Sequence, residues 1–370
     1  MPTTDDEQLE RRRAEARRGC TRWLNGHGLR SPAATLAEIA AAATEPDVDR
    51  YGELGEVAEL EREVVELLGT EAAVFMPSGV LAQQAALRSW AERSSSDAVA
   101  VHGLSHLVRH ELDALSELHH LRLQQLTWEP RQPSVADLDA LAGPLAAVTL
   151  ELPLRDAGYL LPTWDELVAF SARAHERGVP LHLDGARLWE SAPFYGRSYA
   201  DIASLADSVY VSFYKGLGGL AGAALAGPAD LVAEARRWQA RHGGRLFTLL
   251  PYAVAARDGL TRRLSRMSQY VERARDLAAA LDKVPGVRVF PEPPHTNAFR
   301  LFVDVGNERM NEAVLRTAES RHVSLLWGWI TADVPGWAMT ELTVGDATLG
   351  WPVDEQVAAL AELVALARGL

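Results

Sequence analysis

Lysine is unusually scarce in this sequence compared with arginine. Its 370 residues include 37 lysines and arginines, but only Lys215 and Lys283 are lysines. A coding bias toward arginine accounts for the low count without explaining which lysines remain. An amine, unlike a guanidinium, can lose its proton near neutral pH and attack a carbonyl carbon. We therefore expect one of the two lysines to be present for its chemistry.

Cysteine is also scarce, and the sequence has neither a long apolar run nor a net positive charge. Cys20 is the only cysteine, which excludes an intrachain disulfide and favours a reducing compartment. No run approaches the roughly 18 apolar residues of a membrane-spanning helix, and the first residues lack the apolar core of a signal peptide. The formal net charge of −13 disfavours nucleic acid as a partner. We expect a cytoplasmic protein that binds neither membranes nor nucleic acid, and a solvated helix or frayed tail for the basic run at 10–18.

Short apolar runs alternate with longer helix-like segments through the first two thirds of the chain. Near-continuous apolar strands separated by helices are typical of an α/β protein with a mainly parallel sheet covered on both faces. The predicted strands are 71–76, 98–103, 121–126, 147–153, 180–186, 208–213 and 221–227.

The rest of the chain is predicted to be helical from about residue 229 and then to form a separate α+β unit. This unit has a helix near 309–321, a terminal helix, and strand-like runs at 286–290, 297–305, 324–330 and 339–345. We predict three parts: an N-terminal arm (1–50), a large domain (51–245), and a linking helix with a small C-terminal domain (246–370).

The first strand ends in a tight turn that suits a phosphate. Pro77, Ser78 and Gly79 follow the strand, and a helix is predicted to begin directly after them. Parallel sheets place ligand sites at the carboxyl ends of their strands. A helix N-terminus with a hydroxyl and a glycine offers free backbone N–H groups to an anion. The alternative is a plain helix cap by Ser78.

The fifth and sixth strands end in a carboxylate and an amine. Asp184 follows an apolar strand, where its charge is costly unless it meets a cation or several donors. A protonated ring nitrogen would be such a cation, and a salt bridge to Arg187 is the alternative. Lys215 follows the next strand, so both side chains can face one cleft. Glycines after Lys215 match the loose dinucleotide pattern GxGxxA, but that fingerprint must open a helix, and a strand is predicted here.

A phosphate turn, a carboxylate and a reactive lysine on strand ends together meet the needs of pyridoxal 5'-phosphate (PLP). The segments YGELGEVAELEREVVELLGTEAAVFMPSGVLAQQ, LHLDGARLWESAP and SFYKGLGGLAGAALAG resemble the threonine aldolase and β-eliminating lyase family. The resemblance runs from about Tyr51 to Gly244, and the C-terminal third agrees only in outline, through HTNAFRLFVDV. It implies a PLP-dependent transferase-like fold (fold type I): a large domain with a mainly parallel seven-stranded sheet, and a smaller α+β C-terminal domain.

The resemblance also implies how the cofactor is held. Lys215 would bond covalently to the cofactor, and Asp184 would pair with its ring nitrogen. The phosphate would lie at Ser78, Gly79 and Val80.

Two further residues match by position. The resemblance implies that His106 stacks on the pyridine ring, and His106 is our candidate general base. Arg187 would contact the phenolic oxygen of the cofactor or the carboxylate of the substrate. Because His102, His106 and His110 are spaced four apart, a zinc site is the alternative, but no acidic or cysteine partner has matching spacing, and we predict no metal.

The substrate-binding residues depart from the family pattern. The opening RSDT motif is reduced to Arg30 and Ser31, and the histidine expected after the fourth strand is missing from ELPLRDAG, which carries Arg155. The arginine expected to clamp a substrate carboxylate falls at Glu341. We therefore predict substrate contacts by Arg187, Arg155 or Glu341, with Arg300 as a further candidate for the clamp.

Tryptophans near Glu341 bear on the choice of substrate. Trp327, Trp329 and Trp337 can line a pocket for a larger side chain, or they can fill the core of the small domain. With the altered clamp, they lead us to expect an atypical substrate rather than threonine.

The resemblance implies a PLP-dependent lyase that cleaves the Cα–Cβ bond of a β-hydroxy amino acid into glycine and an aldehyde. The alternatives are elimination or another PLP-dependent transformation of an amino acid, and a non-catalytic PLP-fold binding protein. The family further implies a homodimer or homotetramer with shared active sites, to which Arg245 is a candidate contributor.

Overall fold

The computed structural model describes residues 4–370, which pack as two compact units. One unit is Pro32–Met267, and the other combines the chain up to Ser31 with Ser268–Leu370. The domain boundaries predicted near residues 50 and 245 stay a prediction. Within residues 4–370, no helix has the length and apolar character needed to cross a bilayer.

The larger unit is built on a seven-stranded sheet with the order β2-β8-β7-β6-β5-β3-β4. All neighbouring strands are parallel except β8, which runs antiparallel to both β2 and β7. The α/β fold and all seven predicted strands are thereby confirmed. The strands are β2 (Ala72–Met76), β3 (Ala98–Val101), β4 (Arg122–Gln125), β5 (Ala147–Glu151), β6 (Leu181–Gly185), β7 (Ser208–Ser212) and β8 (Ala223–Gly227).

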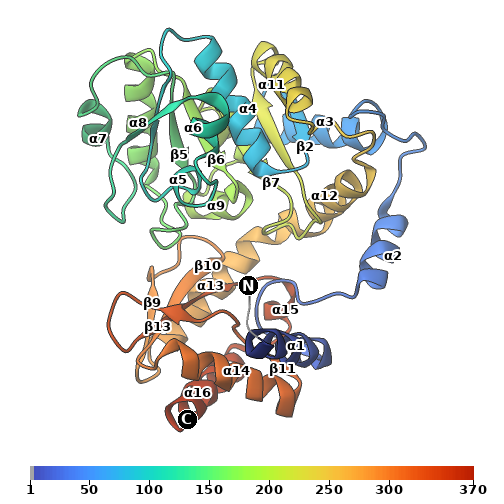
Figure 1. The fold of residues 1–370 in the computed structure, drawn as a ribbon, viewed down its shortest axis with the longest axis vertical. Coiled ribbons are helices and arrows are strands. Elements are labelled where there is room, and N and C mark those ends of the chain that lie inside the picture. The colour runs from blue at the N-terminus through green and yellow to red at the C-terminus, as the bar shows by residue number, and fades with distance from the viewer. Residues whose placement is uncertain (1–3) are drawn as a thin grey trace. The chain divides into compact units, whose positions relative to one another are not determined.

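Helices cover this sheet because its strands are almost wholly apolar (Figure 1). Every residue of β3, β5, β6, β7 and β8 is buried, as expected of a sheet covered on both faces. The helices are α2 (Pro32–Ala42), α3 (Gly55–Leu68), α4 (Gly79–Glu92), α5 (His106–Arg109), α6 (Ala114–His119), α7 (Val135–Asp139), α8 (Trp164–Glu176), α9 (Leu188–Tyr195), α10 (Tyr199–Ala203), α11 (Ala229–Arg241) and α12 (Leu250–Arg263), followed by the 3-10 turn Leu264–Arg266.

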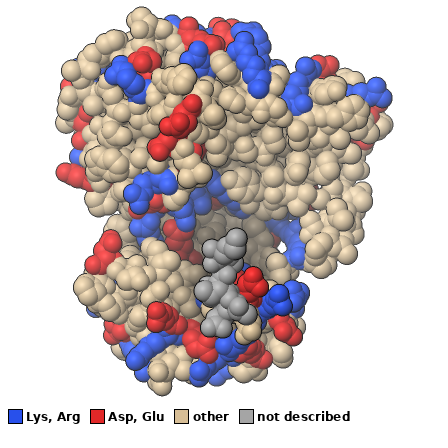
Figure 2. Space-filling view, in the orientation of Figure 1, with Lys and Arg blue, Asp and Glu red and all other residues tan. Residues whose placement is uncertain are grey.

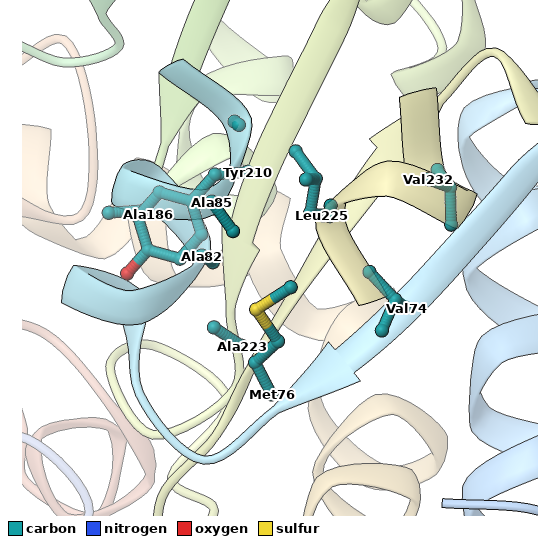
Figure 3. Close-up of a cluster of buried hydrophobic side chains, with 11 residues drawn as sticks. Val74, Met76, Ala82, Ala85, Ala186, Tyr210, Ala223, Leu225 and Val232 are labelled. Atoms are coloured by element: carbon teal, nitrogen blue, oxygen red, sulfur yellow. The ribbon is translucent and has the colours of Figure 1, made fainter. Parts of the chain in front are cut away.

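Small side chains bring α4 close to the sheet. Ala82 and Ala85 of α4 lie beside Tyr210 of β7 in one buried cluster, which also includes Ala186 (Figure 3). The cluster also includes Val232 of α11, so α4 and α11 pack on the same hydrophobic cluster. This close approach places the first turn of α4 directly at the edge of the sheet.

The smaller unit contains a four-stranded antiparallel sheet, β12-β13-β10-β9, and a two-stranded parallel pair, β1 and β11. Its strands are β1 (Arg22–Trp23), β9 (Val287–Phe290), β10 (Ala298–Val303), β11 (Val323–Ser324), β12 (Ile330–Thr331) and β13 (Ala338–Thr343). Its helices are α1 (Thr4–Gly19), α13 (Met267–Leu281), α14 (Asn307–Arg321), α15 (Asp346–Leu349) and α16 (Val353–Arg368).

The basic run at 10–18 is part of helix α1, in agreement with one of its two interpretations. Arg12 of this helix donates to Glu319 of α14 at 2.7 Å and lies 3.4 Å from Glu312. Ion pairs of this kind are frequent elsewhere too, and acidic and basic side chains are interspersed over the face seen in Figure 2.

The strand-like run at 324–330 is mostly not a strand, and this expectation was wrong. Only its first and last residues belong to strands, β11 and β12. Gly328 adopts a φ of 79°, which turns the chain out of an extended path. Trp329 then points inward, where its indole N–H donates to the carbonyl of Leu326 at 2.9 Å. The apolar character of the run thus reflects burial of an irregular segment.

Candidate active site

The turn before α4 offers backbone N–H groups at the edge of the sheet. Ser78 caps the helix, and its Oγ accepts from the N–H of Leu81 at 3.3 Å. The first four N–H groups of a helix have no intrahelical acceptor. Those of Leu81 and Ala82 are used by Ser78, and those of Gly79 and Val80 have no acceptor among residues 4–370. The turn therefore has two donors available for an anion.

Glycine is required at the first position of α4. A Cβ on Gly79 would overlap the hydroxyl and ring of Tyr210, which lies beneath the turn. Burial raises the pKa of Tyr210 well above its ordinary value; the charge of Asp184 raises it further, and the charge of Arg187 lowers it. Tyr210 thus joins the turn to the strand ends that carry the charged residues.

Asp184 is buried at the end of β6, with 3% of its surface exposed. Its Oδ2 accepts from Nε2 of Gln83 at 2.5 Å, and its Oδ1 accepts from the N–H of Ala186 at 3.1 Å. Glu151 of β5 is its partner in register on the neighbouring strand. The carboxylate is therefore held by two donors and lies beside a second acid.

Lys215 lies in the loop between β7 and β8, close to both Asp184 and Arg187. Burial and the cation of Arg187 lower the pKa of Lys215 to about 8, against the opposing effects of Asp184 and Glu151. The loop over residues 213–222 is closed by backbone hydrogen bonds from Phe213 to Gly222 and from Gly219 back to Phe213. The amine is thus a stronger nucleophile near neutral pH than an ordinary lysine.

His106 begins helix α5 and is held by two carboxylates. Its ring Nδ1 lies 3.0 Å from Oε1 of Glu111, and its backbone N–H donates to Oε2 of Glu151 at 2.7 Å. The hydrogen bond to Glu111 raises the pKa of His106 despite burial; the charge of Asp184 raises it slightly further, and the charge of Lys215 lowers it. His106 therefore shares its electrostatic environment with the residues at the two strand ends.

The three evenly spaced histidines do not share a helix. His102 precedes α5, where its Nδ1 accepts from the N–H of Leu104 at 2.9 Å. His110 follows α5 and pairs with Asp156 at 2.9 Å. Among residues 4–370 no group of three or more His, Cys, Asp or Glu side chains is arranged to hold a metal ion.

The two arginines predicted to meet the substrate belong to the same unit as Lys215. Arg187 precedes α9, and its guanidinium lies over the ring of Tyr159 at 5.4 Å. Arg155 donates its backbone N–H to Oε1 of Glu151 at 3.1 Å, and its guanidinium lies 3.5 Å from Asp156. Glu151 thus ties the Arg155 loop to the loop that carries His106.

Glu341 belongs to the other unit. It lies on β13 directly opposite Arg300 of β10, with Oε1 of the glutamate 3.8 Å from Nε of the arginine. Its carboxylate is therefore balanced by a neighbouring cation inside its own sheet.

Two of the three tryptophans pack inside the smaller unit. Trp329 is 3% exposed, and Trp327 packs against Ala16 and Leu315 beneath the guanidinium of Arg17. The alternative that they fill the core agrees with this packing for Trp327 and Trp329.

Sequence reasoning missed four buried polar residues around the site: Gln83, Glu111, Glu151 and Glu190. Burial, and then the charge of Asp184, raise the pKa of Glu151 to about 7. Glu190 lies one turn after Arg187, and its carboxylate packs against Gly216, so no side chain fits there. An acid inside the apolar run AVTLELP was a usable signal for Glu151, whereas the others depend on contacts between elements.

Comparison with known proteins gives the family of this chain. The model of the beta-eliminating lyase family matches residues 30–305. This chain belongs to the beta-eliminating lyase family. Members of the family depend on PLP, and the same fold holds this cofactor in a solved structure of SPT that is 15% identical, with a TM-score of 0.66. PLP is therefore the cofactor of this lyase, and the expected PLP fold of type I is confirmed.

Individual relatives place the lyase close to threonine aldolases. A crystal structure of a proposed aromatic amino acid beta-eliminating lyase/threonine aldolase from Exiguobacterium sp. 255-15 is 38% identical, covers 96% of this chain and 99% of that one, and gives a TM-score of 0.89. The low specificity L-threonine aldolase of Escherichia coli K12 is 30% identical over 77% of this chain and 85% of its own length. An aldolase of Penicillium aethiopicum is 35% identical over 55% of this chain, and the match spans about half of that protein, 53%.

Proposed function

We propose that this lyase cleaves the Cα–Cβ bond of a β-hydroxy amino acid, giving glycine and an aldehyde. The observation that carries the proposal is the position of Lys215, whose lowered pKa reflects burial beside Arg187 and Asp184. A single unit of the protein holds this amine, the buried carboxylate and an anion-binding turn. These groups fit PLP, which supplies an electron sink at the substrate Cα when it is bound.

The cofactor-binding roles follow from the chemistry of each group. Lys215 would hold the cofactor covalently, because its amine is the nucleophile of the site. Asp184 would pair with the ring nitrogen, since a buried carboxylate favours a cation beside it. Ser78, Gly79 and Val80 would hold the phosphate, because the helix start has N–H donors without acceptors there.

His106 is the base that takes the proton of the substrate hydroxyl, directly or through one water. A carboxylate only accepts hydrogen bonds, so Nδ1–H of His106 donates a hydrogen bond to Glu111. This leaves Nε2 as the nitrogen that gains a proton during the reaction. The arrangement is a base oriented by an acid, as in other acid–base sites.

Arg187 and Arg155 are the candidates to bind the substrate carboxylate within the larger unit. Glu341 stays a predicted substrate contact. We further propose that the preferred substrate is atypical rather than threonine. The support is chemical: a glutamate in place of a clamping arginine disfavours a small amino acid through like charge.

We also propose that a second copy of the chain completes the active site. The larger unit carries a groove of about 520 Å³ whose lining includes Tyr51, Leu54 and Arg245. Tyr51 and Leu54 are half or more exposed and adopt positive φ values of 55° and 68°. Exposed apolar side chains in strained conformations indicate a surface that is covered in the working protein.

Mixing two inactive variants tests this shared site. If Arg245 serves the neighbouring subunit, a mixture of Lys215→Ala and Arg245→Ala chains regains activity that neither has alone. Absence of complementation, or a monomeric mass by light scattering, overturns the shared site. A homodimer or homotetramer is the assembly expected.

Product analysis separates the proposed reaction from its alternatives. The purified yellow protein is given L-threonine, L-allo-threonine, β-aryl serines and basic β-hydroxy amino acids, and the products are identified. Glycine with an aldehyde supports the proposal, whereas a keto acid with ammonia indicates elimination, in which Lys215 removes the α-proton. No turnover of any substrate by cofactor-loaded protein would support a binding role instead.

A cytoplasmic location stays part of the proposal.

A further inference from the structure

A chain of buried hydrogen bonds runs from the surface of α4 to Asp184. Trp90 Nε1 donates to Ser208 Oγ at 2.9 Å, and this oxygen lies 2.8 Å from Nδ1 of His182. Nε2 of His182 lies 2.6 Å from Oε1 of Gln83, whose Nε2 donates to Asp184 at 2.5 Å. Gln83, His182 and Ser208 are each at most 1% exposed. The middle of this series of hydrogen bonds therefore has no contact with water.

The donors and acceptors in this chain can be ordered from its two ends. An indole N–H only donates, and an ionised carboxylate only accepts. Gln83 must then present its NH₂ group to Asp184, which leaves its oxygen to accept from His182. A neutral imidazole with its proton on Nε2 accepts at Nδ1, so the hydroxyl of Ser208 donates there. Every hydrogen bond thus points toward Asp184.

The histidine in the middle is neutral. Burial lowers the pKa of His182 to about 3, because no acid contacts its ring and the cation would lie in an apolar interior. The groups that face the ring are the amide of Gln83 and the hydroxyl and backbone of Ser208; none carries a charge, and the backbone of Ser208 raises the pKa by less than burial lowers it. A neutral His182 is the state that the ordering above requires.

We propose that Gln83 and His182 are positioning residues that hold Asp184 in one orientation and keep it an acceptor toward the cofactor. This inference rests on the proposed role of Asp184 beside the ring nitrogen. If these hydrogen bonds ran in the opposite direction, Asp184 would have to carry a proton and donate a hydrogen bond to Gln83. That direction would also leave Ser208 accepting from both Trp90 and His182. A neutral amide at position 83 matters, since a glutamate there would have to share a proton with Asp184.

The cofactor-free protein offers a direct test. In protein labelled with ¹⁵N-histidine, long-range ¹H–¹⁵N spectra report the tautomer of each ring. The His182 signal, assigned by its loss in His182→Gln, is expected to show the neutral form with the proton on Nε2 from about pH 5 to about pH 8. A cationic ring in that range, or a proton on Nδ1, overturns the inference.

Variants of the cofactor-loaded enzyme test the consequence for the site. Gln83→Met and His182→Leu remove the hydrogen bonds, and each is expected to lower kcat by about tenfold to about a hundredfold, as is typical when a residue that orients a reactive group is lost. The ¹⁵N signal of a labelled cofactor ring is expected to move toward the unprotonated form. His182→Gln keeps a donor near the Nε2 position, so kcat and the cofactor ring signal should both return most of the way to parent values. His119→Leu is the matched control, because His119 is another buried histidine whose pKa burial lowers, to about 4.

The outcomes separate this inference from the proposed function. If Asp184→Asn leaves the ring-nitrogen signal and kcat at parent values, the role of Asp184 fails, and the inference fails with it. If Asp184→Asn changes both whereas Gln83→Met and His182→Leu change neither, only the positioning role is overturned. Should His182→Leu fail to fold, Gln83→Met and the tautomer measurement decide.

Discussion

The carboxylate of Glu111 lies 3.0 Å from Nδ1 of His106, five residues earlier in the chain. Their hydrogen bond raises the pKa of His106, and burial raises the pKa of Glu111. The pairing therefore makes His106 keep its proton to higher pH than the imidazole would without Glu111. A base must first lose its proton, so the acid limb of the pH–rate profile is set partly by Glu111.

We predict that Glu111→Gln moves this acid limb to lower pH. Without the carboxylate the pKa of His106 falls, so the base becomes neutral earlier as the pH rises. The measurement is kcat/KM for the best substrate across pH, with Glu117→Gln on the exposed side of α6 as the control. An unchanged limb in Glu111→Gln would remove His106 as the base.

Lys215 is predicted to be the single point of cofactor attachment. Borohydride reduction of the yellow protein, followed by digestion, should leave the cofactor on the peptide that contains Lys215. Lys283 is the only other lysine in the sequence, so the comparison has one alternative. Cofactor on Lys283, or on neither peptide, would end the assignment.

The amine of Lys215 is predicted to titrate near pH 8 in the cofactor-free protein. Reductive methylation with ¹³C-formaldehyde labels both lysines, and NMR follows each through pH, with Lys283→Arg giving the assignment. The pKa in the fold is about 8, against 10.5 as the ordinary value. Between these values the unfolded chain binds more protons, so this group makes stability rise with pH in that window. A titration at the ordinary value would contradict the burial of the amine.

Asp184→Asn is predicted to impair turnover far more than cofactor retention. An amide does not stabilise a cationic ring nitrogen, whereas the turn at Ser78 still holds the phosphate. Loss of a charged partner to a buried cation costs on the order of 3–5 kcal/mol, which is about a hundredfold or more in rate. Absorbance gives the bound cofactor and steady-state kinetics give kcat. Asp139→Asn removes a surface partner of Arg173 and serves as the control; turnover of Asp184→Asn near that of the control would exclude Asp184 as the ring partner.

Glu341→Arg is predicted to improve kcat/KM for L-threonine relative to β-aryl serines. The change removes a negative charge that repels a substrate carboxylate and restores a clamping cation. If Glu341 only balances Arg300, the variant instead places two cations opposite each other across β10 and β13. Thermal unfolding would then show lower stability with unchanged kinetics for threonine.

Strand ends were the part of the site that the sequence could predict. Asp184 and Lys215 each follow an apolar run, and the parallel order of β6 and β7 brings such ends together. The partners Gln83 and Glu111 were not predictable in this way. Gln83 meets Asp184 across 101 positions of sequence, so no local pattern marks it.

The segment around Trp329 shows the opposite limit. Its apolar run has the composition of a strand, but Gly328 and the two hydrogen bonds between Asn311 and the backbone of Trp329 hold it as an irregular loop. Periodicity reports burial, and burial alone does not distinguish a buried loop from a buried strand.

The loop that carries Lys215 begins and ends on neighbouring antiparallel strands, since residues 209–212 of β7 pair with residues 223–226 of β8. A loop closed in this way cannot swing outward without opening the sheet. The guanidinium of Arg263 also donates to the carbonyl of Leu217 at 2.7 Å, two residues beyond the amine. The remaining freedom of Lys215 is rotation about its own side-chain bonds. The conformational entropy of placing Lys215 is therefore lost when the chain folds, so this side chain does not have to be positioned again in each turnover.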